Sequence, residues 1–241
     1  MQATPRTLSS PALEAQDFHS GSSYARGAQH PPLIEQTLGA FMDGMVARHG
    51  AAEALVCVHQ GLRYTYAQLQ QAARQLASAL LRQGLQPGDR VGIWSHNNAE
   101  WVLLQLATAE VGLVLVNINP AYRTSELEYA LNKVGCKALV SMRAFKTSRY
   151  LEMVRELAPE LATCPAGRLA ARRLPLLRLV CWIDVAGQGD DEAGMLRFSD
   201  LFAQGDPEDA AVARIAGSLD AHDPITVSYT HLRAHETKAN L

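Results

Sequence analysis

The sequence predicts an α/β protein, built on a mostly parallel sheet with crossover helices. Short strands that are apolar on both faces occur at 90–94, 113–116 and 137–141, and amphipathic helices lie between them. This alternation is typical of crossover units in a parallel sheet, which are almost always right-handed. The composition, 48% hydrophobic and 19% charged, is ordinary for a globular protein with a buried core.

Helical and strand periodicities place each element along the chain. Thr65 with Gln68, and Ser125 with Glu128, have the spacing of helix-capping pairs. In order, we predict a helix over 33–46, strands over 54–59 and 63–65, a helix over 65–84, a strand over 90–94, a helix over 99–110, a strand over 113–116, a helix over 125–135, a strand over 137–141, a helix over 148–158, a strand over 176–183, a helix over 198–204 and a weakly helical stretch over 206–223 before a strand at Ile225.

The chain divides into three regions that differ in composition and in their pattern of predicted strands and helices. Residues 1–30 are rich in Ser, Ala, Gly and Gln, and we expect a disordered tail rather than a targeting peptide. Residues 31–225 carry the strand–helix alternation and form the predicted folded part. Residues 226–241 depart from it, and we expect a non-native tail there.

Composition also excludes some classes of function. A net charge of −2 and only 6% aromatic residues argue against a nucleic-acid-binding protein. No apolar run approaches the length of about 20 residues that spans a bilayer, so we expect no transmembrane segment. The four cysteines include no CxxC, which favours reduced structural thiols and a cytoplasmic location.

Searching for chemistry-bearing motifs yields little. No phosphate loop, complete dinucleotide fingerprint or nucleophile elbow is present. The half fingerprint at 187–189 lacks its third glycine. The acids at 190–192 lack calcium-loop spacing, which favours a solvated loop. The basic residues Arg143, Lys146, Arg149, Arg168, Arg172 and Arg173 are interleaved with Glu152, Glu156 and Glu160, which favours a charged helix face.

A polar run, residues 95–98, follows the strand at 90–94 and is flanked by Trp94 and Trp101. The carboxyl edge of a parallel sheet is where ligands bind in open α/β folds. His96 beside two Asn side chains is nevertheless more typical of loop stabilisation than of ligand binding. We therefore interpret Asn97 and Trp101 as structural.

Several ordered motifs resemble the adenylate-forming acyl-CoA synthetases, the AMP-binding family, and most closely their fatty-acid-activating members. These motifs are Thr65-Tyr-Ala-Gln-Leu69, Gly84-Leu-Gln-Pro-Gly-Asp-Arg-Val-Gly-Ile-Trp94, Asn97-Asn-Ala-Glu-Trp101, Leu115-Val-Asn-Ile-Asn-Pro-Ala-Tyr-Arg-Thr-Ser-Glu-Leu127, Tyr129-Ala-Leu-Asn132 and Glu156-Leu-Ala-Pro-Glu160. The resemblance covers roughly residues 33–225. It implies the first part of a large AMP-binding domain.

The resemblance also implies a reaction. Full-length members join a fatty or other carboxylic acid to CoA, with ATP and Mg as cofactors and with AMP and pyrophosphate as products. Alternatives are an adenylation domain that loads a carrier protein and a non-catalytic α/β interaction module. No residue here matches a catalytic, cofactor-binding or metal-binding motif of the family, so none is assigned, and we expect this fragment to be inactive.

The family pattern breaks after Asp223-Pro-Ile225, where members carry a glycine-rich phosphate loop. Here residues 227–237 contain no glycine. They match one reading frame of a transposase-type sequencing adapter, in which GTC TCT TAT ACA CAT CTC encodes residues 227–232. We therefore expect adapter read-through, and the metal-ligand spacing of His231 and His235 is then coincidental.

Overall fold

The computed structural model describes residues 30, 32–184 and 191–228, and these separate into two compact units, 1–34 and 35–241. The few described residues of the first unit, at 30 and 32–34, form no helix or strand. The predicted disordered tail, the half fingerprint at 187–189 and the histidines at 231 and 235 lie outside the described residues.

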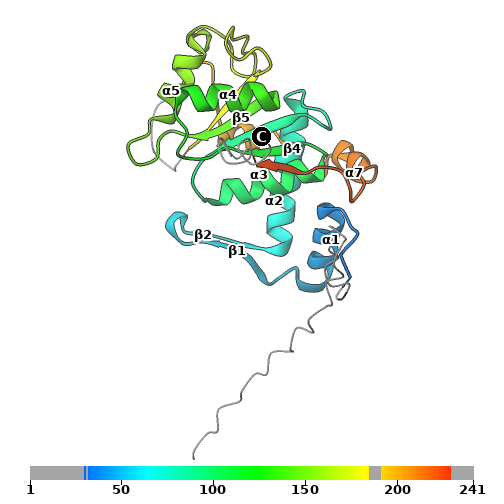
Figure 1. The fold of residues 1–241 in the computed structure, drawn as a ribbon. Coiled ribbons are helices and arrows are strands. Elements are labelled where there is room, and N and C mark those ends of the chain that lie inside the picture. Colours follow the sequence, from blue (N-terminus) through cyan, green and yellow to red (C-terminus); the bar gives the residue numbers. More distant parts are fainter. Residues whose placement is uncertain (1–29, 31, 185–190, 229–241) are drawn as a thin grey trace, which may run out of the picture. The chain divides into compact units, whose positions relative to one another are not determined.

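All of the described secondary structure belongs to the second unit (Figure 1). Its elements are α1 (Leu38–His49), β1 (Glu53–Cys57), the 3₁₀ turn η1 (Val58–Gln60), β2 (Leu62–Thr65), α2 (Tyr66–Arg82), β3 (Arg90–Trp94), α3 (Ala99–Glu110), β4 (Val114–Asn117), α4 (Thr124–Val134), β5 (Cys136–Met142), α5 (Tyr150–Leu157), η2 (Pro159–Ala162), β6 (Leu179–Ile183), β7 (Leu196–Arg197), α6 (Phe198–Ala203), α7 (Ala210–Ala216) and β8 (Thr226–Ser228).

The described strands form two sheets. β1 and β2 make an antiparallel hairpin, as predicted. The other six strands form one sheet in the order β7-β6-β5-β3-β4-β8, and every neighbouring pair is parallel. The predicted α/β class with a parallel sheet is therefore confirmed.

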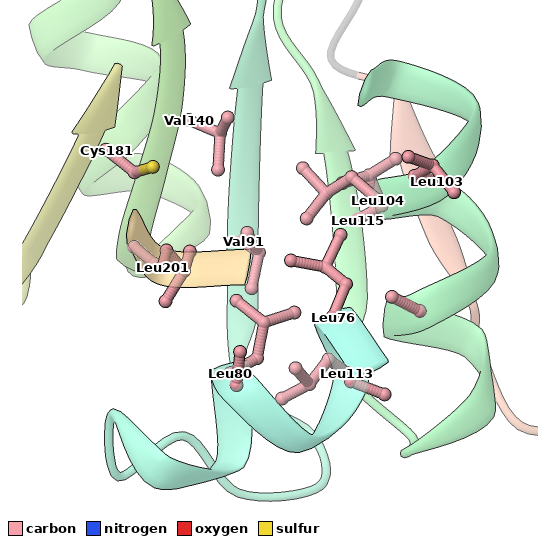
Figure 2. Close-up of a cluster of buried hydrophobic side chains, with 14 of the residues drawn as sticks. Leu76, Leu80, Val91, Leu103, Leu104, Leu113, Leu115, Val140, Cys181 and Leu201 are labelled. Carbon is pink, nitrogen blue, oxygen red and sulfur yellow. The ribbon is translucent and has the colours of Figure 1, made fainter. Parts of the chain in front are cut away.

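Two apolar layers cover the two faces of this sheet. On one face, α2 and α3 pack against the sheet, and Leu76 of α2 lies with Val91 of β3 and Leu115 of β4 in a cluster of fully buried side chains (Figure 2). On the other face, α4 and α5 pack against Trp94, which stacks on Tyr150 at a ring-centroid distance of 4.0 Å. Because strands such as β4 and β6 are covered on both sides, their sequences are almost continuously apolar.

Helix starts follow local side-chain capping. The Thr65 hydroxyl accepts a hydrogen bond from the Gln68 amide, and the Gln68 side chain accepts one from the Thr65 amide, which confirms the predicted capping box. The predicted cap at Ser125 was wrong. Helix α4 begins earlier, at Thr124, because Glu126 accepts a hydrogen bond from the Arg123 amide at 2.9 Å and satisfies the first turn.

Further boundaries differ from the prediction. The strand expected over 54–59 ends at Cys57, where η1 begins, and the strand expected at Ile225 is β8, which begins at Thr226. The strand expected from residue 176 begins at Leu179, and the weak helix expected over 206–223 is confined to α7. Helix α1 begins at Leu38, where Thr37 caps it, rather than at residue 33. β7 has only two residues, so its apolar pattern is too short to be recognised.

Candidate functional site

A hollow of about 340 Å³ lies at the carboxyl edge of the parallel sheet. We call it the carboxyl-edge hollow. Its floor comes from residues at the ends of β5 and β6, and its walls come from the β1–β2 connection and from the loop after β3. It is lined by His59, Gln60, Leu62, His96, Asn98, Glu100, Met142, Ile183 and Asp184. The position is the one at which open parallel sheets bind ligands.

Gln60 organises the wall of this hollow. Its amide nitrogen donates to both carboxylate oxygens of Glu100, at 3.0 and 2.8 Å, and its amide oxygen accepts from the backbone N–H of Ala99 at 2.8 Å. The same oxygen accepts from the Cys57 thiol at 2.8 Å. One side chain therefore ties the hairpin connection to the first turn of α3.

His96 lies beside two other rings. It stacks on Phe145 at 5.0 Å and faces the His59 ring at 5.8 Å. Desolvation by burial, followed by the nearby His59, lowers the pKa of His96, and Glu100 opposes this shift. The Nδ1 atom of His96 is buried and makes no hydrogen bond to any residue that the structure describes.

Ser95 and Asn98 of the polar run make hydrogen bonds within the protein. Asn98 caps α3 by accepting from the Trp101 amide at 2.9 Å, and its side-chain nitrogen donates to the Ser95 hydroxyl at 2.8 Å. The Trp94 indole donates to the carbonyl of Asn119 at 3.1 Å. These contacts agree with loop stabilisation, but whether Asn97 and Trp101 have a further role stays untested.

The acidic stretch at 190–192, predicted to be a solvated loop, is exposed at Asp191 but not at Glu192. The Glu192 carboxylate is only 10% exposed and forms ion pairs with Arg143, at 2.5 Å, and with Arg155. Asp191 is exposed and pairs with Arg197 at 2.6 Å. Both carboxylates are therefore paired with arginines. Among the described residues, no group of three or more His, Cys, Asp or Glu side chains could hold a metal ion.

The prediction that the basic residues share one charged helix face was wrong. Arg173 forms a two-bonded pair with Glu128, at 2.9 and 2.6 Å, which joins the segment before β6 to α4. Arg168 instead lines a different hollow, together with Arg82 and Arg178. Long-range pairing separates side chains that are close in sequence.

All four cysteines are free thiols in the structure. Desolvation raises the pKa of Cys136 to about 12, and burial also raises the pKa of Cys181. Both thiols therefore stay protonated near neutral pH and are poor nucleophiles. This agrees with the structural role that the sequence predicts for them.

The lining of the carboxyl-edge hollow sets what it can bind. Glu100 and Asp184 contribute two carboxylates, and the described lining residues include no Lys or Arg. Asp184 is already occupied, because its oxygens accept from the Ser199 amide at 3.1 Å and hydroxyl at 2.9 Å. This side-chain set does not suit a triphosphate, which requires cations. The sequence predicts His96 to be a loop residue. The hydrogen bonds between Gln60 and Glu100 could not be predicted from the sequence, because the two residues are 40 positions apart.

A parallel sheet covered on both faces, with a hollow at its carboxyl edge, is the architecture of an α/β domain. Residues 43–230 match the family model described as "AMP-binding enzyme", and the chain belongs to this family. The fold is similar to that of the anthranilate CoA ligase AuaEII solved with anthranoyl-AMP, with a TM-score of 0.62 and 20% identity, over 82% of this chain and 33% of that one.

Curated relatives are more similar in sequence. The chain is 40% identical over 212 residues to the Rattus norvegicus protein named "Medium-chain acyl-CoA ligase ACSF2, mitochondrial", covering 87% of this chain and 34% of the relative. It is 33% identical over 205 residues to the "Putative acyl-CoA synthetase YngI" of Bacillus subtilis, covering 82% and 36%. The chain thus spans about a third of the length of these relatives.

Two predictions on location and membranes can be placed here. Within the described ranges, no helix has both the length and the apolar character needed to cross a bilayer. The cytoplasmic location stays a prediction.

Proposed function

We propose that this chain is the front part of an AMP-forming acid–CoA ligase. The observation that carries the proposal is the family match over residues 43–230, together with 40% identity to a protein named as a medium-chain acyl-CoA ligase. The whole protein would join a carboxylic acid to CoA at the expense of ATP. Medium-chain fatty acids are the substrate class that the names of the relatives favour.

In the proposed reaction, the carboxylate attacks the α-phosphate of ATP and pyrophosphate leaves, and the CoA thiolate then displaces AMP to give the thioester. Mg²⁺ would neutralise charge on the phosphates. We assign neither step to a side chain of this chain. Its own contribution is the parallel sheet, whose packed layers hold the carboxyl edge rigid, and rigid placement of reacting groups is a large part of catalysis.

The carboxyl-edge hollow supports this division of labour. Its carboxylates would repel a triphosphate, and the described lining residues offer no cation to offset them. The phosphate-binding groups of the reaction are therefore proposed to lie outside the described residues. In the family, the segment after Asp223-Pro-Ile225 supplies them, and here that segment lacks glycine.

Long-read sequencing of the source locus is the first test. We expect a glycine-rich phosphate loop in place of residues 227–237, followed by the rest of the ligase. An intact genomic codon run for residues 227–237 would instead show that the tail is native and would refute the adapter interpretation.

The activity test uses the protein encoded by that locus and the 241-residue chain side by side. We expect ATP–pyrophosphate exchange with a medium-chain fatty acid, and acyl-CoA formation on adding CoA, from the complete protein alone. Exchange without acyl-CoA formation would favour the carrier-loading alternative. Exchange by the 241-residue chain would overturn the assignment of the chemistry to residues outside it.

A further inference from the structure

A second hollow, of about 680 Å³, lies at the amino edge of the same sheet. We call it the amino-edge hollow. One wall is the end of α2 and the turn that follows it, and the other walls are the 166–169 loop and the residue before β6. Its lining residues are Arg82, Gln83, Gly84, Ala166, Gly167, Arg168, Leu169 and Arg178.

The charge of this lining is one-sided. Arg82, Arg168 and Arg178 all line the hollow, and no acidic side chain is among the described lining residues. Arg82 is partly engaged, since it donates to the carbonyl of Gln204 at 2.8 Å and lies 3.9 Å from Asp209. The guanidinium groups of Arg168 and Arg178 make no hydrogen bond or ion pair within the described part of the chain.

The backbone holds the segments that carry Arg168 and Arg178 next to each other in the lining of the hollow. The amide of Leu169 donates to the carbonyl of Arg178 at 2.9 Å, and the amide of Arg178 donates to the carbonyl of Lys137 at 2.8 Å. Leu169 is 1% exposed and anchors the 166–169 loop in the core. The backbone positions of the two arginines are therefore set before any ligand arrives, which leaves only their side chains to be ordered on binding.

Two glycines keep the hollow open. Gly84 and Gly167 have φ angles of 83° and 75°, in the left-handed region that favours glycine. A side chain at Gly167 would approach the Gln83 amide oxygen at 3.0 Å. The space between α2 and the 166–169 loop is therefore left free of side chains at these two positions.

We propose that the amino-edge hollow binds a phosphate-bearing small molecule, with Arg168 and Arg178 as its principal ligands. Arginine forks match phosphate oxygens with paired hydrogen bonds, and three guanidinium groups suit a ligand with several negative charges better than a single carboxylate. The volume is in the range of small-molecule pockets. The site lies at the opposite edge from the carboxyl-edge hollow and does not depend on the proposed ligase activity.

Calorimetric titration of the 241-residue chain with inorganic pyrophosphate tests this proposal. The unmodified chain should bind, and R168A/R178A should raise the dissociation constant at least about fivefold, because two charge-assisted contacts are lost. Both arginines are exposed, so the double variant should melt like the parent chain. The control R48A/R149A removes the same charge from exposed arginines outside the lining and should bind as the parent does.

A charge added inside the hollow provides an independent variant. Ala166→Glu places a carboxylate among the arginines, and it should abolish binding while leaving the fold intact, since Ala166 is exposed. Equal loss of affinity in R168A/R178A and R48A/R149A would reduce the effect to overall charge and overturn the site. Absence of pyrophosphate binding by the parent chain would overturn it outright.

The same chemistry could come from a lipid headgroup, and a second arm separates the two sources. Vesicles containing phosphatidic acid in phosphatidylcholine are offered to the parent chain in a flotation assay. Pyrophosphate binding without flotation supports the proposed small-molecule ligand. Flotation that requires Arg168 and Arg178, without pyrophosphate binding, would overturn it in favour of a membrane surface.

Discussion

The carboxyl-edge and amino-edge hollows lie at opposite edges of the same parallel sheet. They differ in whether their polar side chains are bonded within the protein. At the carboxyl edge, Gln60 and Glu100 satisfy one another, and Asp184 is held by Ser199. At the amino edge, Arg168 and Arg178 face the hollow without a partner among the described residues. The Gln60, Glu100 and Asp184 side chains of the carboxyl-edge hollow are thus hydrogen-bonded to one another or to neighbouring residues. In the amino-edge hollow, the Arg168 and Arg178 guanidinium groups remain available as donors.

This difference separates two uses of polar residues. A side chain that is saturated by protein partners adds rigidity, and removing it costs stability. A fixed cation without a protein partner adds little to stability and remains available to a ligand. Substitutions at the carboxyl edge should therefore appear in unfolding experiments, and substitutions at the amino edge should appear in binding experiments.

The largest effect should come from a residue that supports both hollows. Leu76 of α2 is fully buried against the sheet (Figure 2), and α2 connects the two edges. Leu76→Ala should lower the free energy of unfolding by about 2–5 kcal/mol, through lost burial and a residual cavity, as measured by urea denaturation. The exposed Leu176→Ala should cost under about 0.5 kcal/mol. Similar costs for both would contradict the core assignment.

Gln60→Ala should have the next largest effect, confined to the carboxyl edge. It leaves Glu100 and the Ala99 amide without their partner, so we expect a loss of about 1–2 kcal/mol in unfolding free energy. Pyrophosphate affinity at the amino edge should not change. Gln86→Ala, whose side chain is exposed, is the control. A fall in pyrophosphate affinity would show that the two edges are coupled.

Asp209→Asn should act on the amino edge alone. Asp209 lies 3.9 Å from Arg82, and hydrogen bonds from Ser78 and the Ala211 amide lower its pKa. The single oxygen of asparagine still accepts from the Ala211 amide and caps the helix, and its NH2 group donates to the Ser78 hydroxyl in place of the bond that Asp209 accepts. Arg82 is then released toward the hollow, and pyrophosphate should bind about twofold tighter in calorimetry. Asp206→Asn makes the same charge change without a recorded pair to Arg82, so an equal gain there would contradict the pairing argument.

The smallest effect should be the pH response of His96. Its pKa is lowered from 6.5 in the folded protein, so the unfolded chain binds more protons on acidification. Stability should therefore fall as the pH drops through 6.5 and stop falling below the folded-state pKa. His59, Glu100 and Asp184 line the same hollow as this ring.

The pH test compares urea denaturation midpoints of His96→Gln and the parent chain between about pH 7 and pH 5. The variant should lose less stability over this interval. The exposed His222→Gln should follow the parent. Identical profiles for His96→Gln and the parent would refute the role of His96 in the acid response.

Local chemistry made much of the fold predictable. The capping box of Thr65 and Gln68, and the continuously apolar strand over 90–94, act over a few residues and were visible in the sequence. The predicted cap of α4 was wrong, because Ser125 and Glu128 have the spacing of a capping pair two residues beyond the true N-cap, Arg123. Strand order is a long-range property, and periodicity carries no information about it.

The two hollows were less predictable than the fold. The carboxyl edge was indicated by the polar run after Trp94, but its main contact joins Gln60 to Glu100 across 40 residues. The amino edge was not predicted at all. Arg168 was counted as part of a charged helix face, and only its backbone neighbour Leu169, paired with Arg178, places it at the hollow.

The position of β8 has a consequence for the order of events during synthesis. β8 pairs with β4 although it falls at the start of the expected non-native tail, and the Thr226 hydroxyl donates to the carbonyl of Leu115 across a separation of 111 residues. Strands β3, β4 and β5 follow one another closely, so they can pair while later residues are still on the ribosome. Until β8 arrives, the outer edge of β4 is open to strands of other chains, and this interval is when the nascent protein is most exposed to misassembly.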